Sequence, residues 1–188
     1  MKRIWMGIVR ICGWKYNIPE CGTRPELQHC VIAVAPHTSI DDFFLGACCL
    51  WKLGINFRIF IKKEFFNKFT RVILDKLAIP VDRGNRSNGL VAQAVKYFNE
   101  NDDFALVVTP EGTRKAVKRW KRGFYEIAVE AKVPIVLAYV DYGKKTMGVG
   151  PTFYPTGDFS ADLPKIMDFY KDITPRHKEG YNKECPND

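Results

Sequence analysis

The sequence has little that could hold a metal ion. It contains three histidines and six cysteines among 188 residues, and no two of them stand at the spacing of a zinc site. The adjacent Cys48 and Cys49 cannot easily bridge each other, and the other spacings suggest no disulfide framework. We therefore expect no metal centre, and free thiols in a reducing cytoplasm.

Long apolar runs are also absent. No segment approaches the roughly 18 consecutive apolar residues that a membrane-spanning helix needs. The first residues do not read as a secretory signal, because Arg10 interrupts their short apolar stretch. There is no internal repeat or low-complexity tract, and 46% hydrophobic residues can build one core. We expect a single domain that is soluble or peripheral to a membrane.

Positive charge is in excess. The 29 Lys and Arg residues outnumber the 21 Asp and Glu residues, which gives a net charge of +8. Nucleic acid, acidic lipid, a phosphorylated substrate and an acidic carrier protein would all be attracted. A nucleic-acid-binding module should show stacking aromatics among its basic residues or a recognisable motif, and neither is present. We therefore expect no nucleic acid, and a basic nucleic-acid-binding domain is only the alternative from another class.

Short apolar strands alternate with helical patterns along the chain. Helices are expected over residues 1–12, 38–51, 64–77, 87–100, 124–131 and 159–170, and strands over 30–35, 55–61, 79–81, 104–108 and 134–141. Residues 143–150 are expected to form a turn before one more extended piece. The alternation predicts an α/β fold, a single domain with a mixed, mostly parallel sheet flanked by helices.

The two ends of the chain differ from its middle. We divide the sequence into an amphipathic N-terminal helix (1–14), a main domain (15–173) and a polar C-terminal tail (174–188), which we expect to be loosely held. In the first segment apolar residues recur at helical spacing, with basic residues off that stripe. Such a helix can lie in a bilayer interface or pack on its own domain, and both interpretations stay open.

A polar cluster directly follows the first expected strand. His37 comes after Pro36 and is followed by Asp41 and Asp42. A carboxylate that fixes the tautomer of a histidine and stabilises its imidazolium makes a general base. Within one continuous helix Asp42 would lie about 140° round the axis from His37, so this pairing requires His37 to sit on the turn before the helix, which Pro36 favours. The alternative is that the aspartates only stabilise the helix N-terminus.

Two further clusters follow strands. In the run Pro110–Arg114, Gly112 lets the backbone approach a ligand and Arg114 can bind a phosphate with two hydrogen bonds. Residues 82–86 place Arg83 at the same position relative to another strand. Taken alone, either cluster could be an ordinary solvated turn. Because ligands bind at the carboxyl ends of strands in open α/β sheets, the three clusters together indicate one site.

Four blocks in this order resemble the glycerolipid acyltransferase family, which includes the 1-acylglycerol-3-phosphate O-acyltransferases, or lysophosphatidic acid acyltransferases. The blocks are His37–Asp42, which matches the family's HxxxxD motif, Val81–Arg83, Pro110–Arg114 and Val133–Val136. The resemblance runs from about residue 30 to residue 140 and implies a glycerol-3-phosphate acyltransferase-like fold for the main domain. The sequence departs from the family beside these blocks, at Thr109 and Ala78.

The resemblance also implies roles for these residues. His37 would take the proton from an acceptor hydroxyl as it attacks an acyl thioester, and Asp42 would orient the imidazole. The residues that would bind the acceptor are Arg83, Glu111, Gly112, Thr113 and Arg114. No cofactor is implied beyond the acyl donor, which would be acyl-carrier protein or acyl-coenzyme A.

The expected acceptor is a lysolipid, with lysophosphatidic acid as the default that the family supplies and phosphatidic acid as its product. A lyso-aminoacyl lipid of the ornithine or glycine type is the alternative, because the arginines could bind a carboxylate nearly as well as a phosphate.

Such an enzyme would work as a peripheral protein on the cytoplasmic face, against an anionic membrane surface. The candidate contacts are the N-terminal helix and a basic run. This run consists of Arg114, Lys115, Lys118, Arg119, Lys121 and Arg122, with Trp120 among them. It could equally bind the carrier protein or be a solvated face.

Overall fold

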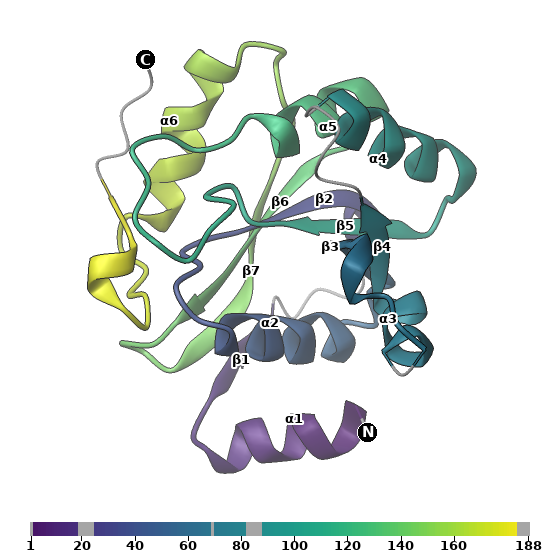
Figure 1. Ribbon diagram of the computed structural model, residues 1–188. Coiled ribbons are helices and arrows are strands. Elements are labelled where there is room, and N and C mark those ends of the chain that lie inside the picture. The colour runs from purple at the N-terminus through teal and green to yellow at the C-terminus, as the bar shows by residue number, and fades with distance from the viewer. Residues whose placement is uncertain (1, 19–24, 69, 82–87, 184–188) are drawn as a thin grey trace.

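The predicted α/β fold is confirmed by a computed structural model, which describes residues 2–18, 25–68, 70–81 and 88–183 (Figure 1). The helices are α1 (Lys2–Ile11), α2 (Asp41–Lys52), α3 (Arg71–Leu77), α4 (Asn88–Glu100), α5 (Gly123–Ala131) and α6 (Phe159–Tyr170). The strands are β1 (Lys15–Asn17), β2 (His29–Val34), β3 (Phe57–Lys62), β4 (Ala78–Val81), β5 (Phe104–Val108), β6 (Ile135–Asp141) and β7 (Thr146–Phe153).

The seven strands form one mixed sheet in the order β1-β7-β6-β2-β5-β3-β4. Every neighbouring pair is parallel except β6 and β7. The five strands from β2 to β6 in the chain therefore run in one direction, and their carboxyl ends meet at one edge. In an open α/β sheet this edge is where ligands bind, so the topology brings the clusters at His37–Asp42 and Pro110–Arg114 to the same side, whereas residues 82–86 lie outside the described residues.

Helices cover both faces of the sheet, with α2 on one side and α4, α5 and α6 on the other (Figure 1). The central strand β2 is apolar from Cys30 to Val34 because successive side chains enter opposite cores. Ile32 packs in the cluster with Leu50 on the α2 side. Val31 packs in the cluster with Phe124 on the opposite side.

Helix α1 packs outside α2 (Figure 1). Val9 is buried in a small cluster that includes Cys48 and Cys49, so these two cysteines are core residues. Ile8 and Ile11 on the same helix stay 44% and 86% exposed. The side of α1 that carries Val9 thus packs on the domain, while the apolar side chains of Ile8 and Ile11 face solvent. Among the described residues, no helix has the length and apolarity to cross a bilayer.

The helix expected over residues 64–77 is confirmed only from Arg71 to Leu77. A 3-10 turn covers Lys63–Phe65, and α3 begins only at Arg71. Asn67 and Thr70 explain the break, since the backbone N–H of each donates to the side-chain oxygen of the other at 3.1 and 3.0 Å. Such local bonds compete with the helical hydrogen-bond pattern.

The turn expected over residues 143–150 is also wrong in most of its length, because β7 begins at Thr146 and runs antiparallel to β6. Its glycines serve close packing in a strand. A Cβ at Gly148 would lie 2.2 Å from the carbonyl oxygen of Asn17, which belongs to the neighbouring strand β1. The sequence analysis did not predict β1, which is only three residues long.

The C-terminal segment is more closely held than its polar composition indicated. Its described part, residues 174–183, packs beside the carboxyl edge of the sheet. The Tyr142 N–H donates to the Thr174 carbonyl at 2.9 Å, and the His177 N–H donates to Thr38 Oγ1 at 3.2 Å. Tyr181 is buried. Hydrogen bonds of the backbone do not depend on apolar side chains, so the sequence pattern could not indicate that this segment is held to the domain.

Candidate functional site

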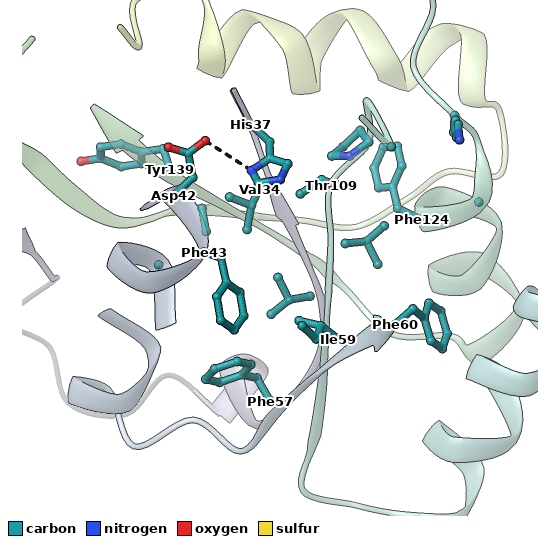
Figure 2. A pocket seen from close by; sticks show the side chains of 18 of the residues that line it. Val34, His37, Asp42, Phe43, Phe57, Ile59, Phe60, Thr109, Phe124 and Tyr139 are labelled. Carbon is teal, nitrogen blue, oxygen red and sulfur yellow. Dashed lines mark ion pairs between the residues drawn. The ribbon is translucent and has the colours of Figure 1, made fainter. Parts of the chain in front are cut away.

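His37 lies on the turn between β2 and α2. Because α2 begins at Asp41, His37 precedes the helix, and its Nδ1 lies 3.3 Å from Asp42 Oδ2 (Figure 2). The N–H groups of Thr38 and Ser39 donate to the same oxygen at 2.7 and 2.8 Å. The turn therefore wraps around the carboxylate and brings His37 to it, which is the arrangement that this pairing requires.

Asp42 is 2% exposed and still favours the charged state. Burial raises the pKa of this carboxyl, but hydrogen bonds from His37, Tyr142 and the two N–H groups of the turn outweigh burial and leave the pKa below its usual value. Tyr142 donates its hydroxyl to Asp42 Oδ1 at 2.7 Å. A charged Asp42 can fix the tautomer of His37 and stabilise its imidazolium.

Sequence reasoning missed Tyr142. The residue lies 100 positions from Asp42, directly after β6. The available signal was its position at the carboxyl end of an expected strand, the edge at which ligands bind.

Glu111 contacts the backbone of His37. It is 2% exposed, and its Oε1 accepts the backbone N–H of His37 at 3.0 Å. Its Oε2 has no hydrogen-bond partner among the described residues. Burial raises the pKa of this carboxyl to about 7, although the His37 N–H acts in the other direction. Glu111 thus holds the backbone of His37 and is not among the residues that line the cavity, and the acceptor contact that the family resemblance implied stays a prediction.

A cavity of about 1100 Å³ opens beside His37. Its apolar wall extends along both sides of the strand ends (Figure 2). The residues on the α2 side include Val34, Phe43, Gly46, Leu50, Phe57 and Ile59, and those toward α4 and α5 include Phe60, Leu90, Val91, Phe124 and Ile127. A cavity of this size and polarity can hold a long hydrocarbon chain with its reactive end at the imidazole.

Three cations form the polar rim of the cavity. Arg114, Lys121 and Arg122 are exposed and line it, and none of them makes an ion pair with a carboxylate in the part of the chain that is described. Gly112, with φ +64°, gives Lys121 room, since a Cβ at this glycine would lie 2.7 Å from Lys121 Cε. Unpaired cations that converge beside a base suit an anionic group on the substrate.

Two predicted acceptor-binding residues remain, Thr113 and Arg83. Thr113 lines the cavity, and Arg83 lies outside the described residues. Sequence analysis assigned Gly112 but missed Lys121 as its neighbour, because the two come together only through the fold of the loop between β5 and α5.

Trp120 corrects one expectation. It is 4% exposed and packs against Phe124 and Tyr170, with ring centroids 6.3 and 5.7 Å away. It therefore packs the loop between β5 and α5 against the core, and its side chain is not available for insertion into a bilayer. The basic residues of the run all remain exposed. Within the described ranges, no cluster of three or more His, Cys, Asp or Glu side chains could hold a metal ion.

Comparisons with known proteins agree with this fold. The fold is similar to the crystal structure of the 1-acyl-sn-glycerophosphate (LPA) acyltransferase PlsC from Thermotoga maritima, with a TM-score of 0.61 and 14% sequence identity over 90% of this chain and 75% of that chain. No curated protein matches the sequence closely. A sequence model of the family described as Acyltransferase matches residues 15–140. Because this match spans more than half of the 188 residues, the chain belongs to the acyltransferase family.

Proposed function

We propose that this protein transfers a fatty acyl group from an acyl thioester to the free hydroxyl of lysophosphatidic acid, which yields phosphatidic acid. The observation that carries the proposal is the pairing of His37 with the buried Asp42, 3.3 Å apart, at the mouth of a largely apolar cavity with a cationic rim. The similarity to a solved lysophosphatidic acid acyltransferase supports the choice of acceptor.

In the proposed reaction His37 is the general base. Its Nδ1 faces Asp42, so the opposite ring nitrogen, Nε2, takes the proton of the acceptor hydroxyl. The hydroxyl oxygen attacks the thioester carbonyl carbon and forms the new ester bond. The carbon–sulfur bond breaks, and the leaving thiolate takes the proton from the imidazolium. Asp42 stabilises the imidazolium while it carries the proton.

The acceptor phosphate would bind at the rim of the cavity. Arg114, Lys121 and Arg122 supply the positive charge there, and Arg83 is proposed to add to it. Thr113 lines the same wall, and Gly112 keeps Lys121 in place. Glu111 is proposed to act indirectly, by holding the backbone of His37. The hydrocarbon chains would lie against the apolar walls on either side of the strand ends.

The donor and the membrane complete the proposal. Acyl-carrier protein or acyl-coenzyme A would supply the thioester, and no further cofactor is needed. The exposed Ile8 and Ile11 of α1 and the exposed basic run support contact with an anionic bilayer. We place the reaction on the cytoplasmic face, where a reducing environment keeps thiols such as those of Cys48 and Cys49 free.

The test is an acyl-transfer assay with purified protein, each donor separately, and a panel of lysolipids with and without a phosphate. His37→Ala is the central variant. His177→Ala is its matched control, because that side chain is exposed and does not line the cavity. Melting temperatures check that both variants fold. We expect lysophosphatidic acid to be acylated, His37→Ala to lose turnover, and His177→Ala to keep it.

Each other outcome has a defined meaning. Turnover that survives in folded His37→Ala removes His37 from the role of base. Acylation of a lysolipid without phosphate, and not of lysophosphatidic acid, keeps the chemistry and refutes the acceptor. No transfer with either donor refutes the proposed activity.

A further inference from the structure

We propose that a groove between α1 and α2 binds the phosphate headgroup of an anionic phospholipid in the bilayer. This site is separate from the cavity beside His37. The inference rests on the proposed action at a membrane surface and names the residues through which the protein would recognise that surface.

The groove has a volume of about 660 Å³. The residues that form its walls and that matter for binding are Gly7, Arg10, Trp14, Lys15, Tyr16 and Lys52. They come from α1, the turn after it, β1 and the last turn of α2, so the groove exists only because α1 packs across α2. Helix α1 lies outermost on this side of the sheet (Figure 1), so a surface that α1 lies on would be next to the residues of the groove.

The charge of the groove selects an anionic ligand. Three of its side chains, those of Arg10, Lys15 and Lys52, are exposed cations. No acidic side chain of the described ranges lines the groove, and no described carboxylate forms an ion pair with these three. Lys52 lies over the ring of Tyr16 at 5.5 Å, which holds the ammonium group at the groove wall.

The surroundings point to a lipid as the source of the phosphate. Ile8 and Ile11, on the same helix as Arg10, expose apolar side chains that a bilayer interface would cover. A helix that inserts these groups places the cations of the groove at the level of the headgroups. A soluble anion would explain the charge of the groove but leave the exposed isoleucines without a partner.

The groove also adjoins the catalytic residues. Trp14, in its wall, packs edge-on against Tyr142 with ring centroids 5.0 Å apart. Tyr142 donates to Asp42 at 2.7 Å. A headgroup bound in the groove would therefore orient the mouth of the cavity toward the bilayer that supplies the acceptor.

Vesicle flotation tests this site with bilayers of phosphatidylcholine alone and of phosphatidylcholine mixed with phosphatidylglycerol. The readout is the preference of the protein for the anionic vesicles. We expect each of Arg10→Gln, Lys15→Gln and Lys52→Gln to lower this preference about fivefold. Lys132→Gln is the matched control, because it removes an exposed charge after α5, on the other side of the sheet, and it should change the preference little.

A second pair of variants separates a bound headgroup from a diffuse positive field. A Cβ at Gly7 meets no atom within 4 Å, so Gly7→Leu and Gly7→Gln fill the groove without changing its charge. Both should lower the preference for phosphatidylglycerol to a similar degree, and the glutamine variant does so without adding apolar surface.

Two results would overturn the proposal. One is an unchanged preference in both Gly7 variants, which would mean that the cations act only as a field. The other is a loss of preference for anionic vesicles in Lys132→Gln as large as in the groove variants. This would mean that any exposed positive charge on the protein contributes equally to vesicle binding. Acyl transfer to detergent-dispersed acceptor, measured on the same variants, should stay at the wild-type level. If the wild-type protein binds vesicles as expected but transfers no acyl group, the proposed function fails while the headgroup site stands.

Discussion

Two buried carboxylates flank His37, and their surroundings differ. Asp42, on the turn into α2, is 2% exposed and receives hydrogen bonds from Tyr142 and from two backbone N–H groups besides facing the imidazole. Glu111, after β5, is also 2% exposed but receives the N–H of His37 on one oxygen and has no described partner on the other. Burial raises the pKa of both groups, yet the pKa of Asp42 ends below its usual value and that of Glu111 at about 7.

The two carboxyls are equally hidden from solvent, and the comparison teaches that hydrogen-bond donors then help to decide which of them is charged. A buried carboxylate with several donors is stabilised as an anion, whereas one with a single donor is not. The two groups consequently suit different tasks. Asp42 faces the ring of His37 and can stabilise a positive charge there, while Glu111 holds the backbone and carries less charge near neutral pH.

The largest expected effect comes from Asp42→Asn. The amide oxygen can accept the N–H groups of Thr38 and Ser39, and the amide NH2 can donate to the hydroxyl of Tyr142, so the turn should keep its shape. The negative charge that stabilises the imidazolium of His37 is lost, although the amide oxygen still faces Nδ1. We expect kcat to fall by about 10³-fold, measured with saturating lysophosphatidic acid.

Asp162→Asn is the control for this change. Asp162 is the other fully buried aspartate with a lowered pKa, since its hydrogen bonds outweigh the burial that raises it. It binds Tyr125 and Thr156, and none of these three residues lines the cavity. That variant should lose stability but keep its turnover per folded molecule. Equal turnover in wild type and folded Asp42→Asn would show that charge at Asp42 is not needed.

The next effect is on stability, and it comes from Glu111→Gln. The pKa of Glu111 in the folded protein, about 7, lies above the ordinary 4.5. Between these values the unfolded chain ionises first, so the stability that Glu111 contributes below pH 4.5 is lost as the pH rises through 7. The loss is on the order of 3 kcal/mol. Glutamine does not titrate, so the variant should gain this amount relative to wild type over the same range.

Urea unfolding of both proteins between about pH 4 and pH 8 measures the difference, in which the other titrating groups cancel. The exposed Glu130 supplies the control, because Glu130→Gln should give a difference that is flat with pH. A flat difference for Glu111→Gln as well would mean that Glu111 and Asp42 share the same charge state, and the contrast between the two carboxylates would be lost.

The sequence predicted the parts of the site that are local. The apolar run of β5 was predicted with the observed bounds, Phe104–Val108. The pairing of His37 with Asp42 required a turn before α2, and Pro36 indicated that turn. These features depend on residues within a few positions of one another, where backbone geometry alone limits the choices.

The parts that sequence reasoning missed are formed by distant contacts. The hydroxyl of Tyr142 reaches Asp42 across 100 positions, and the N–H of His177 reaches Thr38 across 139. The side chain of Lys121 crosses Gly112 only because the loop folds back. No periodicity marks such contacts, since each uses a single polar group at the end of a strand or in a loop.

The smallest of these effects, and the one that isolates a single hydrogen bond, is expected for Tyr142→Phe. The change removes one donor from Asp42 and leaves the ring in place against Trp14. The pKa of Asp42 should rise toward its usual value, which carbon NMR of the carboxyl group can follow. Turnover should fall about tenfold, because a buried hydrogen bond to a charged group is lost.

Tyr125→Phe is the matched control for Tyr142→Phe, because it removes a tyrosine–aspartate hydrogen bond of the same kind. Tyr125 also donates to a buried aspartate, Asp162, at 2.7 Å, the same length as the bond between Tyr142 and Asp42. Both variants should lower the melting temperature, but only Tyr142→Phe should change turnover and the pKa of Asp42. If the two variants lose only stability, Tyr142 merely packs against the turn. A selective loss of turnover would instead mean that the hydroxyl of Tyr142 helps to keep Asp42 charged beside His37, which is the feature that separates Asp42 from Glu111.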